Sequence, residues 1–258
     1  MRKLLLAGAA LSLATLPTAG GAVDFTVGAG VGVAPDYEGS DDYEAVPLWN
    51  LRADDLYDPN TYVQVFATKL NSNFLPHENW RLGLSAEYIM KRKDVDDDRV
   101  DDMRNTDDGL LVGALVGYDF NIAEERVLGL ELDPRWDISD DIGGLVTARA
   151  NYRAPFGEKW RYRLGVEGTW ASTEYMSEFF GVDAADAARS GLKQEDADSG
   201  IKDIGISGDL SYSFTESWSA TGLLAYNRLL GDAEDSPVVD DRGDENQLFA
   251  GVLVNFRW

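Results

Sequence analysis

Few residues in this chain could do chemistry. His77 is the only histidine among 258 residues and there is no cysteine, which excludes disulfides, thiolate metal sites and cysteine nucleophiles. His77 stands between Pro76 and Glu78 in a connection between predicted strands, with Ser72 and Ser85 near it in sequence. Acid–base catalysis needs groups within hydrogen-bond reach, and this spacing establishes no triad. A turn residue without a catalytic role is favoured, and a hydrolase is the alternative.

Three alternating aspartates, Asp94, Asp96 and Asp98, resemble the start of a calcium-binding loop. Such a loop requires glycine at its sixth position and a bidentate glutamate at its twelfth. Here the sixth position holds Arg99 and the twelfth holds Asn105. We therefore expect no specific metal site and no cofactor.

The charge of the chain excludes another class of function. It has 23 Lys and Arg against 46 Asp and Glu, a formal net charge of −23, and such a field repels nucleic acid. The acidic residues gather in segments typical of loops: 36–44, 54–58, 94–108, 137–141, 183–203 and 232–245. These loops either form a solvated surface, which we favour, or bind divalent cations that bridge lipopolysaccharide.

The elements that must position these groups are strands. In residues 246–258 one side is apolar and ends in an aromatic residue: Leu248, Ala250, Val252, Val254, Phe256 and Trp258. Residues 80–90, 160–170 and 203–214 alternate as cleanly, and each has about the nine to eleven residues of a tilted membrane-spanning strand. Apolar faces toward lipid, polar faces toward a wet lumen and aromatic ends predict an antiparallel transmembrane β-barrel. A secreted β-sandwich is the alternative, with shorter strands and no aromatic belts.

The number of strands follows from parity. Weaker alternation in 23–33, 45–52, 62–70, 110–120, 126–136, 145–154 and 218–229 brings the candidates to eleven. Single-chain bacterial barrels have an even number of strands. We therefore predict twelve, with a short additional strand in 52–61, and ten as the alternative. Short connections such as 121–125, 156–159 and 215–217 are expected in the periplasm, and the long acidic ones outside.

The two remaining segments have their own signatures. Residues 1–22 have a positive start, an apolar run and a small-residue end, which predict a signal peptide. A membrane anchor is the alternative, but the run is too short to span a bilayer. Residues 23–258 then form one barrel domain. The long connection 171–202 is expected to fold over the barrel mouth, with a helix in 183–190 that Asp183 caps and Gly191 ends.

Charged residues also alternate within the strands and are expected to face the lumen: Arg81, Glu87, Arg149, Arg153, Arg161, Arg163 and Glu167. Such residues either line a conduction pathway or fill a small barrel with their own ion-paired side chains. The sequence leaves both possibilities open.

Three blocks of sequence together resemble one family. The first, 28–48, contains Pro35, Tyr37, Gly39 and Ser40; the second, 179–192, contains Phe180, Gly181 and Val182; the third, 218–239, contains Asp232, Ser236 and Pro237. In these residues the chain resembles the MltA-interacting protein family, MipA/OmpV. It departs from that family in the aspartates of 94–108 and in ending on Trp258, where phenylalanine is more usual.

The resemblance implies an outer-membrane barrel of Gram-negative bacteria without enzymatic activity. It implies a scaffold that brings a lytic transglycosylase together with a murein synthase. Other relatives are linked to osmotic response, adhesion and antibiotic susceptibility, so a small pore or a surface receptor is the alternative function. Outer-membrane lipid, lipopolysaccharide and the barrel assembly machinery are the further expected partners. In barrels that resemble this one, terminal aromatics such as Phe256 and Trp258 form the signal that the assembly machinery recognises.

Overall fold

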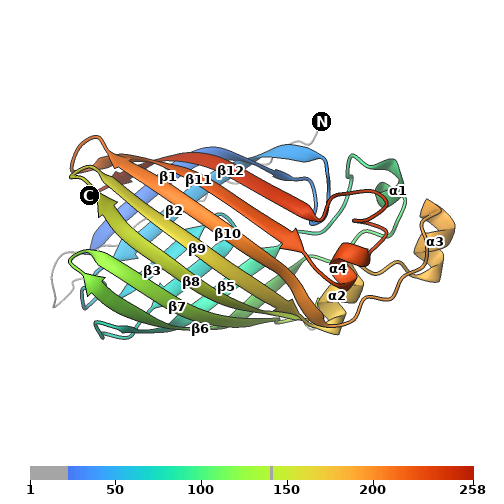
Figure 1. Ribbon diagram of the computed structural model, residues 1–258, viewed down its shortest axis with the longest axis horizontal. Coiled ribbons are helices and arrows are strands. Elements are labelled where there is room, and N and C mark those ends of the chain that lie inside the picture. The colour runs from blue at the N-terminus through green and yellow to red at the C-terminus, as the bar shows by residue number, and fades with distance from the viewer. Residues whose placement is uncertain (1–22, 140–141) are drawn as a thin grey trace.

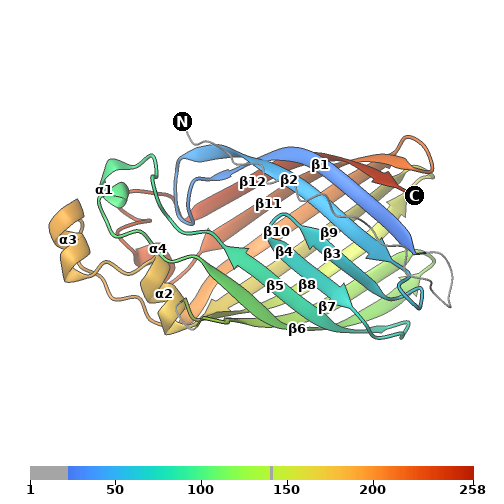
Figure 2. The same ribbon diagram turned by 180° about the vertical axis from the view of Figure 1, so that it is seen from behind.

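In the computed structural model, residues 23–139 and 142–258 are described. The predicted signal peptide, 1–22, lies outside the described residues. The described chain forms a closed barrel of twelve strands in the order β1-β12-β11-β10-β9-β8-β7-β6-β5-β4-β3-β2, and Figures 1 and 2 show it from opposite sides. Every neighbouring pair is antiparallel, as in β1 with β2 and β1 with β12. The predicted fold class and strand number are confirmed.

The elements follow one another along the chain with four short helices between the strands. The strands are β1 (Asp24–Pro35), β2 (Tyr43–Asp54), β3 (Tyr62–Phe66), β4 (Lys69–Asn73), β5 (Trp80–Ile89), β6 (Gly109–Ala123), β7 (Arg126–Asp137), β8 (Gly144–Phe156), β9 (Trp160–Ala171), β10 (Gly200–Ser213), β11 (Trp218–Leu229) and β12 (Asn246–Arg257). The helices are α1 (Asp98–Asp101), α2 (Thr173–Phe179), α3 (Ala184–Ser190) and α4 (Asp232–Asp235). None of the helices in the described residues is long and apolar enough to cross a membrane.

The two ends of the barrel differ. All four helices and the long connections lie at one end, which we call the loop end (Figure 1). The C-terminus and the short connections 124–125, 157–159 and 214–217 lie at the other, which we call the turn end. Short turns and long loops at opposite ends are typical of bacterial outer-membrane barrels.

Side chains alternate across the barrel wall as the sequence predicts. On β9 and β12, Leu164, Val166, Val252 and Val254 are exposed on the outside. Closure between β1 and β12, from Thr26↔Arg257 to Val33↔Ala250, pairs the backbone groups that an open sheet would leave bare. Such pairing is essential in lipid, where an unpaired backbone group finds no water.

One predicted strand is in the wrong place. Residues 55–61 form a turn, with Asp55 at φ 58°, and contain no strand. The twelfth strand arises because the predicted segment 62–70 divides into β3 and β4 at Ala67 (φ 47°) and Thr68. No glycine, proline or asparagine marks this hairpin, so its alternation resembled one continuous strand. Figure 2 shows that both strands are short.

The sheet is irregular where β4 meets β5. Ser72 Oγ accepts a hydrogen bond from Leu84 N (2.7 Å), and Asn73 Oδ1 accepts one from Leu82 N (2.9 Å). These side chains replace ladder bonds that the backbone of β4 does not make. A Cβ on Gly83 would lie 1.9 Å from Ser72 O, so only glycine allows this approach.

The predicted helix in the long loop is confirmed. Asp183 accepts hydrogen bonds from Ala185 N (2.8 Å) and Asp186 N (2.7 Å) at the start of α3. Gly191 ends α3 at φ 72°, a left-handed conformation that glycine adopts at little cost. Such a cap stabilises a helix by about 1 kcal/mol.

Candidate functional site

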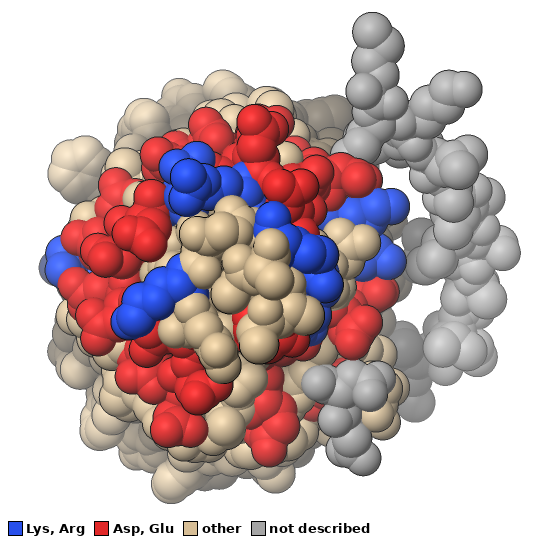
Figure 3. Space-filling model, turned by 90° about the vertical axis from the view of Figure 1, so that its right-hand side faces the viewer, with Lys and Arg blue, Asp and Glu red and all other residues tan. Residues whose placement is uncertain are grey.

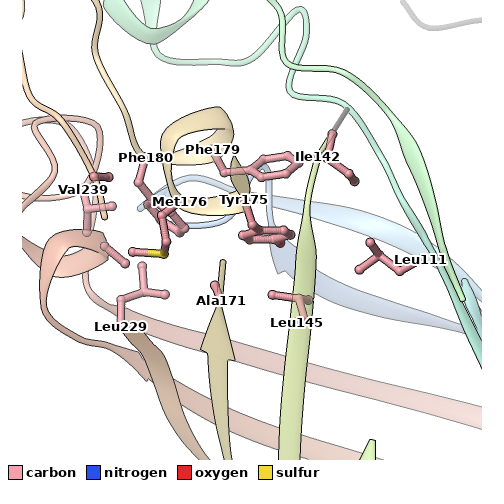
Figure 4. Packing of buried hydrophobic residues seen from close by; sticks show 12 residues of the cluster. Leu111, Ile142, Leu145, Ala171, Tyr175, Met176, Phe179, Phe180, Leu229 and Val239 are labelled. Atoms are coloured by element: carbon pink, nitrogen blue, oxygen red, sulfur yellow. The ribbon is translucent and has the colours of Figure 1, made fainter. Parts of the chain in front are cut away.

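The mouth of the barrel at the loop end is filled by a folded plug, which we define as α2, α4 and the buried side chains around them. Strands β6, β8, β9 and β11 contribute to this cluster, so it reaches across the mouth (Figure 4). Its buried members are Leu111, Ile142, Leu145, Ala171, Tyr175, Met176, Phe179, Phe180, Ala197, Leu229, Ala233 and Val239. Figure 3 shows the surface of the loop end, with uncharged residues near its centre and both basic and acidic side chains around them. The predicted cover over the mouth is therefore present.

A second buried cluster binds the outer loops to one another. It contains Tyr37 from the β1–β2 loop, Val100 and Met103 from the β5–β6 loop, and Val182 and Val238 from the two later loops. Four connections that are far apart in the sequence thus share one apolar core. The loops at this end form one packed layer because each contributes apolar side chains to it.

The three sequence blocks of the family resemblance meet in the plug. Gly39 N donates to Gln247 Oε1 (3.1 Å), and Ser236 Oγ donates to Phe180 O (2.5 Å). Gly39 has φ +98°, and a Cβ there would lie 2.5 Å from Val239 Cγ2. The backbone at Gly39 therefore requires glycine for both its conformation and its close packing.

The other residues of these blocks also hold the loops. Gly181 N donates to Met176 O and Ser177 O (both 3.2 Å) just after α2, and Asp232 Oδ2 accepts from Asp198 N (2.7 Å). Five further block residues lie at the loop end: Pro35 ends β1; Ser40 and Pro237 are buried; Tyr37 and Val182 lie in the second cluster. The blocks therefore describe a packed loop structure, which no spacing in the sequence reveals.

A buried ion-pair cluster fastens the plug to the wall. Lys202 Nζ on β10 lies 2.7 Å from Asp203 Oδ2 and also pairs with Glu38 of the β1–β2 loop. Tyr175 Oη on α2 donates to Glu38 Oε2 (3.0 Å). Burial and the charge of Glu38 hold the pKa of Tyr175 well above its usual value, so its hydroxyl stays a donor. Removing one partner of a buried ion pair leaves the other charge uncompensated, at a cost of about 3–5 kcal/mol.

A further set of ion pairs joins the β5–β6 loop to the helices. Arg104 Nη1 lies 2.7 Å from Glu178 Oε2 of α2, and Arg104 N donates to Asp186 Oδ1 of α3 (2.7 Å). Arg242 of the β11–β12 loop pairs with Asp97, 2.5 Å from Nη2 to Oδ2. Glu178, Asp186 and Asp97 are thus examples of acidic loop residues that pair with groups of other loops.

Below the plug, one wall of the lumen carries a ladder of ion pairs. Arg81 Nη1 lies 2.8 Å from Glu131 Oε2, and Arg149 reaches both Glu131 Oε1 (2.6 Å) and Glu167 Oε2 (2.8 Å). The charged residues predicted to face inward on these strands do so. Sequence reasoning did not single out five others: Lys69, Asp119, Glu131, Asp133 and Arg135. The alternation of β6 and β7 was the signal that could have found most of them.

The turn end of the lumen is open. A cavity of about 620 Å³ lies there, lined by residues from β1 and β7 to β12 and by the short turns. Its charged lining includes Arg153, Arg161 and Arg163, while Ser211 and Asn255 supply neutral polar groups. We call this cavity the vestibule. The lumen is therefore filled by the plug at the loop end and open to solvent at the turn end.

The candidate catalytic group does not assemble. His77 is exposed, and its Nδ1 accepts hydrogen bonds from Asn79 N (3.0 Å) and Trp80 N (3.1 Å). Ser72 is bonded to the β5 backbone, and Ser85 to Asp133 inside the barrel. His77 thus organises the turn between β4 and β5, which is the role that the sequence favoured.

The aspartates of 94–108 serve the loop structure. Asp97 caps α1 by accepting from Arg99 N (3.0 Å) and Val100 N (2.9 Å), and it also pairs with Arg242. Within the described ranges 23–139 and 142–258, no group of three or more acidic or histidine side chains is arranged to hold a metal ion.

The two aromatics predicted as an assembly signal lie side by side at the turn end. Trp258 stacks on Phe25 (5.7 Å between centroids) and on Phe256 (5.8 Å), and Phe256 contacts Trp218 (4.8 Å). Phe25 and Trp258 also exchange two backbone hydrogen bonds. The cluster sits where the first and last strands close the barrel.

Comparison with known proteins agrees with the sequence blocks. The profile of the MltA-interacting protein MipA matches residues 27–258. The chain belongs to the MipA family. Its relatives include the MltA-interacting proteins of Escherichia coli (strain K12) and Shigella flexneri, each 33% identical over 91 residues. These alignments span 31% of this chain and only 36% of each relative.

The chain also has a likeness to solved structures of outer-membrane proteins. An outer membrane channel from Pseudomonas putida F1 has a TM-score of 0.47 and 12% identity, covering 94% of this chain and 97% of its own. The NanC porin has a TM-score of 0.44 and 10% identity, with coverage of 91% and 99%. Likeness at this level carries no information on function. As a MipA-family barrel, this protein is located in the outer membrane of a Gram-negative cell, with the turn end in the periplasm.

Proposed function

We propose that this MipA-family barrel is a non-catalytic scaffold that binds a murein-degrading lytic transglycosylase, and with it a murein synthase, at its periplasmic end. Family membership carries the proposal, because the relatives are named for binding MltA. In this proposal residues 1–22 are a secretory signal, and the cluster of Phe256 and Trp258 is recognised by the assembly machinery. Outer-membrane lipid and lipopolysaccharide surround residues 23–258.

The structure offers a periplasmic surface suited to this role, which we call the turn platform: the connections 55–61 and 74–79. These are longer than the other connections at the turn end. Tyr57 Oη donates to Phe74 O, and Asn73 Nδ2 donates to Asn60 O (2.6 Å). These bonds already hold the two connections together. A partner that binds there therefore loses little free energy to the ordering of loops and side chains.

The turn platform has the composition of a protein-binding surface. Tyr57 is 57% exposed and Phe74 is 40% exposed, and exposed aromatic groups with a polar rim mark such surfaces. The rim is acidic, with Asp55, Asp58 and Glu78. A partner with a basic patch around an apolar centre fits this surface.

The filled loop end gives the alternative of a pore less support. A solute would have to pass the buried cluster of α2 and α4 and the ion pairs of Lys202. The proposal therefore expects purified barrel to be silent in planar-bilayer recordings.

The test is binding of the purified lytic transglycosylase from the same cells to the full barrel in detergent. We expect binding that falls at least about tenfold in the double variant Tyr57→Ser, Phe74→Ser, because loss of central aromatic contacts costs about 2 kcal/mol or more. Phe156→Ser is the matched control, since Phe156 is 69% exposed in another part of the turn end. Wild-type barrel that fails to bind the enzyme overturns the proposal.

A further inference from the structure

Like charges face one another in the vestibule. Strand register places Arg153 of β8 directly opposite Arg163 of β9, and both side chains line the cavity. Arg161 lies two residues before Arg163 and therefore on the same face. Like charges at opposed positions of neighbouring strands destabilise a sheet. Three guanidinium groups thus share one patch of wall in a chain whose net charge is −23.

Three carboxylates also line the vestibule, Glu125, Asp209 and Glu216, and only Asp209 lies within ion-pair distance of one of the three arginines. Asp119 pairs with Arg153, but it also lies 3.3 Å from Arg81 Nε. Asp209 Oδ1 is 3.6 Å from Arg163 Nε, and the Arg163 side chain is 58% exposed. Within the described part of the chain, the side chain of Arg161 has no ion pair or hydrogen bond and is exposed. The guanidinium groups of the patch therefore keep N–H donors that an anion from outside the barrel can bind.

The other residues of the vestibule limit the chemical class and the size of the anion that can bind. Beside the arginines, on the following strands β10, β11 and β12, Ser211, Ser213, Ser219 and Asn255 offer small polar groups. The aromatic residues of the lining, Tyr162 and Trp218, belong to the outward-facing sets of β9 and β11. No inward-facing ring of the described lining is placed to stack on a sugar or a base. The cavity of about 620 Å³ admits several residues of an extended peptide.

We propose that the vestibule is an anion-binding site that takes a short acidic peptide segment from the periplasm. Its carboxylates pair with Arg153, Arg161 and Arg163, and its backbone contacts the serines of the neighbouring strands β10 and β11. Guanidinium groups bind carboxylates with two parallel hydrogen bonds, which fix the geometry of the pair as well as its charge. The plug closes the outer route, so the ligand enters and leaves through the turn end.

The test is calorimetric titration of the full purified barrel in detergent with hexaglutamate. We expect saturable binding that weakens as salt rises, because exposed charges are screened. The variant Arg161→Gln should bind about tenfold more weakly, since a charge-assisted hydrogen bond contributes roughly 1.5 kcal/mol or more. The side chain of Arg161 makes no ion pair or hydrogen bond with the described residues, so this variant should keep the wild-type circular dichroism.

The control is Arg99→Gln, which removes the same charge from an exposed arginine of α1 at the loop end. It should bind hexaglutamate as wild type does. Equal loss in Arg99→Gln and Arg161→Gln, or no binding by wild type, overturns the site. Hexalysine is attracted to the acidic loops of a chain with net charge −23, and its binding should be the same in wild type and Arg161→Gln. Trigalacturonate that binds as tightly as hexaglutamate overturns the choice of a peptide.

This site is separate from the turn platform, and the two proposals fail separately. Arg161→Gln should leave binding of the lytic transglycosylase unchanged, while Tyr57→Ser with Phe74→Ser should leave the titration with hexaglutamate unchanged.

Discussion

The plug should open when its central aromatic is removed. Phe180 is fully buried in the cluster that spans the mouth. Replacing such a residue by alanine costs about 3–5 kcal/mol in lost burial and cavity formation. The backbone hydrogen bonds between the strands do not involve this side chain. The lost free energy therefore destabilises the closed state of the plug relative to an open state. The open population should rise at least about a hundredfold, since each 1.4 kcal/mol is a factor of ten.

The absence of cysteine makes the opening measurable. In an Ala197→Cys background, the new thiol lies in the plug at a position that is 1% exposed, so a maleimide reaches it only when the plug opens. Adding Phe180→Ala should accelerate labelling about a hundredfold and produce openings in planar-bilayer recordings. Phe120→Ala, at a residue 43% exposed on the outside of β6, is the control. Equal labelling rates with and without Phe180→Ala would refute the assigned role of the plug.

Three further outcomes are expected. Gly83→Ala should lower the yield and thermal midpoint of folded barrel, because its Cβ would lie 1.9 Å from a backbone oxygen of β4; Gly222→Ala, with nothing within 4 Å of its Cβ, should change neither. Burial raises the pKa of Asp97, but the hydrogen bonds that it accepts from Arg242 and from the backbone of α1 have the larger effect, so the net pKa lies below its usual value. Asp97 therefore stabilises the loop layer above its unfolded-state pKa of about 4 and loses this effect as pH falls through its lower folded-state pKa. Arg242→Gln should move that loss to higher pH, as seen by hydrogen exchange of α1, and an unshifted loss contradicts the assignment. Deleting Trp258 should reduce the inserted fraction in membrane fractionation without changing binding of hexaglutamate by the barrel that does insert.

Local patterns determined much of the fold before any tertiary contact was known. Alternation of apolar and polar residues in segments such as 160–170 has a period of two because successive side chains of a strand point to opposite faces. That periodicity indicated a barrel and its lumen-facing charges, while the even strand number came from the rule that single-chain bacterial barrels have an even number of strands. Asp183 and Gly191 marked the ends of α3 because capping is also a local interaction. The hairpin at Ala67 was missed because no residue in it signals a turn.

The arrangement of the functional parts was decided only by the closed structure. Gly39, Phe180 and Ser236 are far apart in the sequence, and they come together because the loops that carry them pack over the same end of the barrel. The opposition of Arg153 and Arg163 depends on the register between two strands, and a shift of one residue would turn one of them toward lipid. Composition and periodicity place a side chain on a face. Only the closure of twelve strands determines which faces look at each other across the lumen, because that depends on contacts between segments distant in the chain.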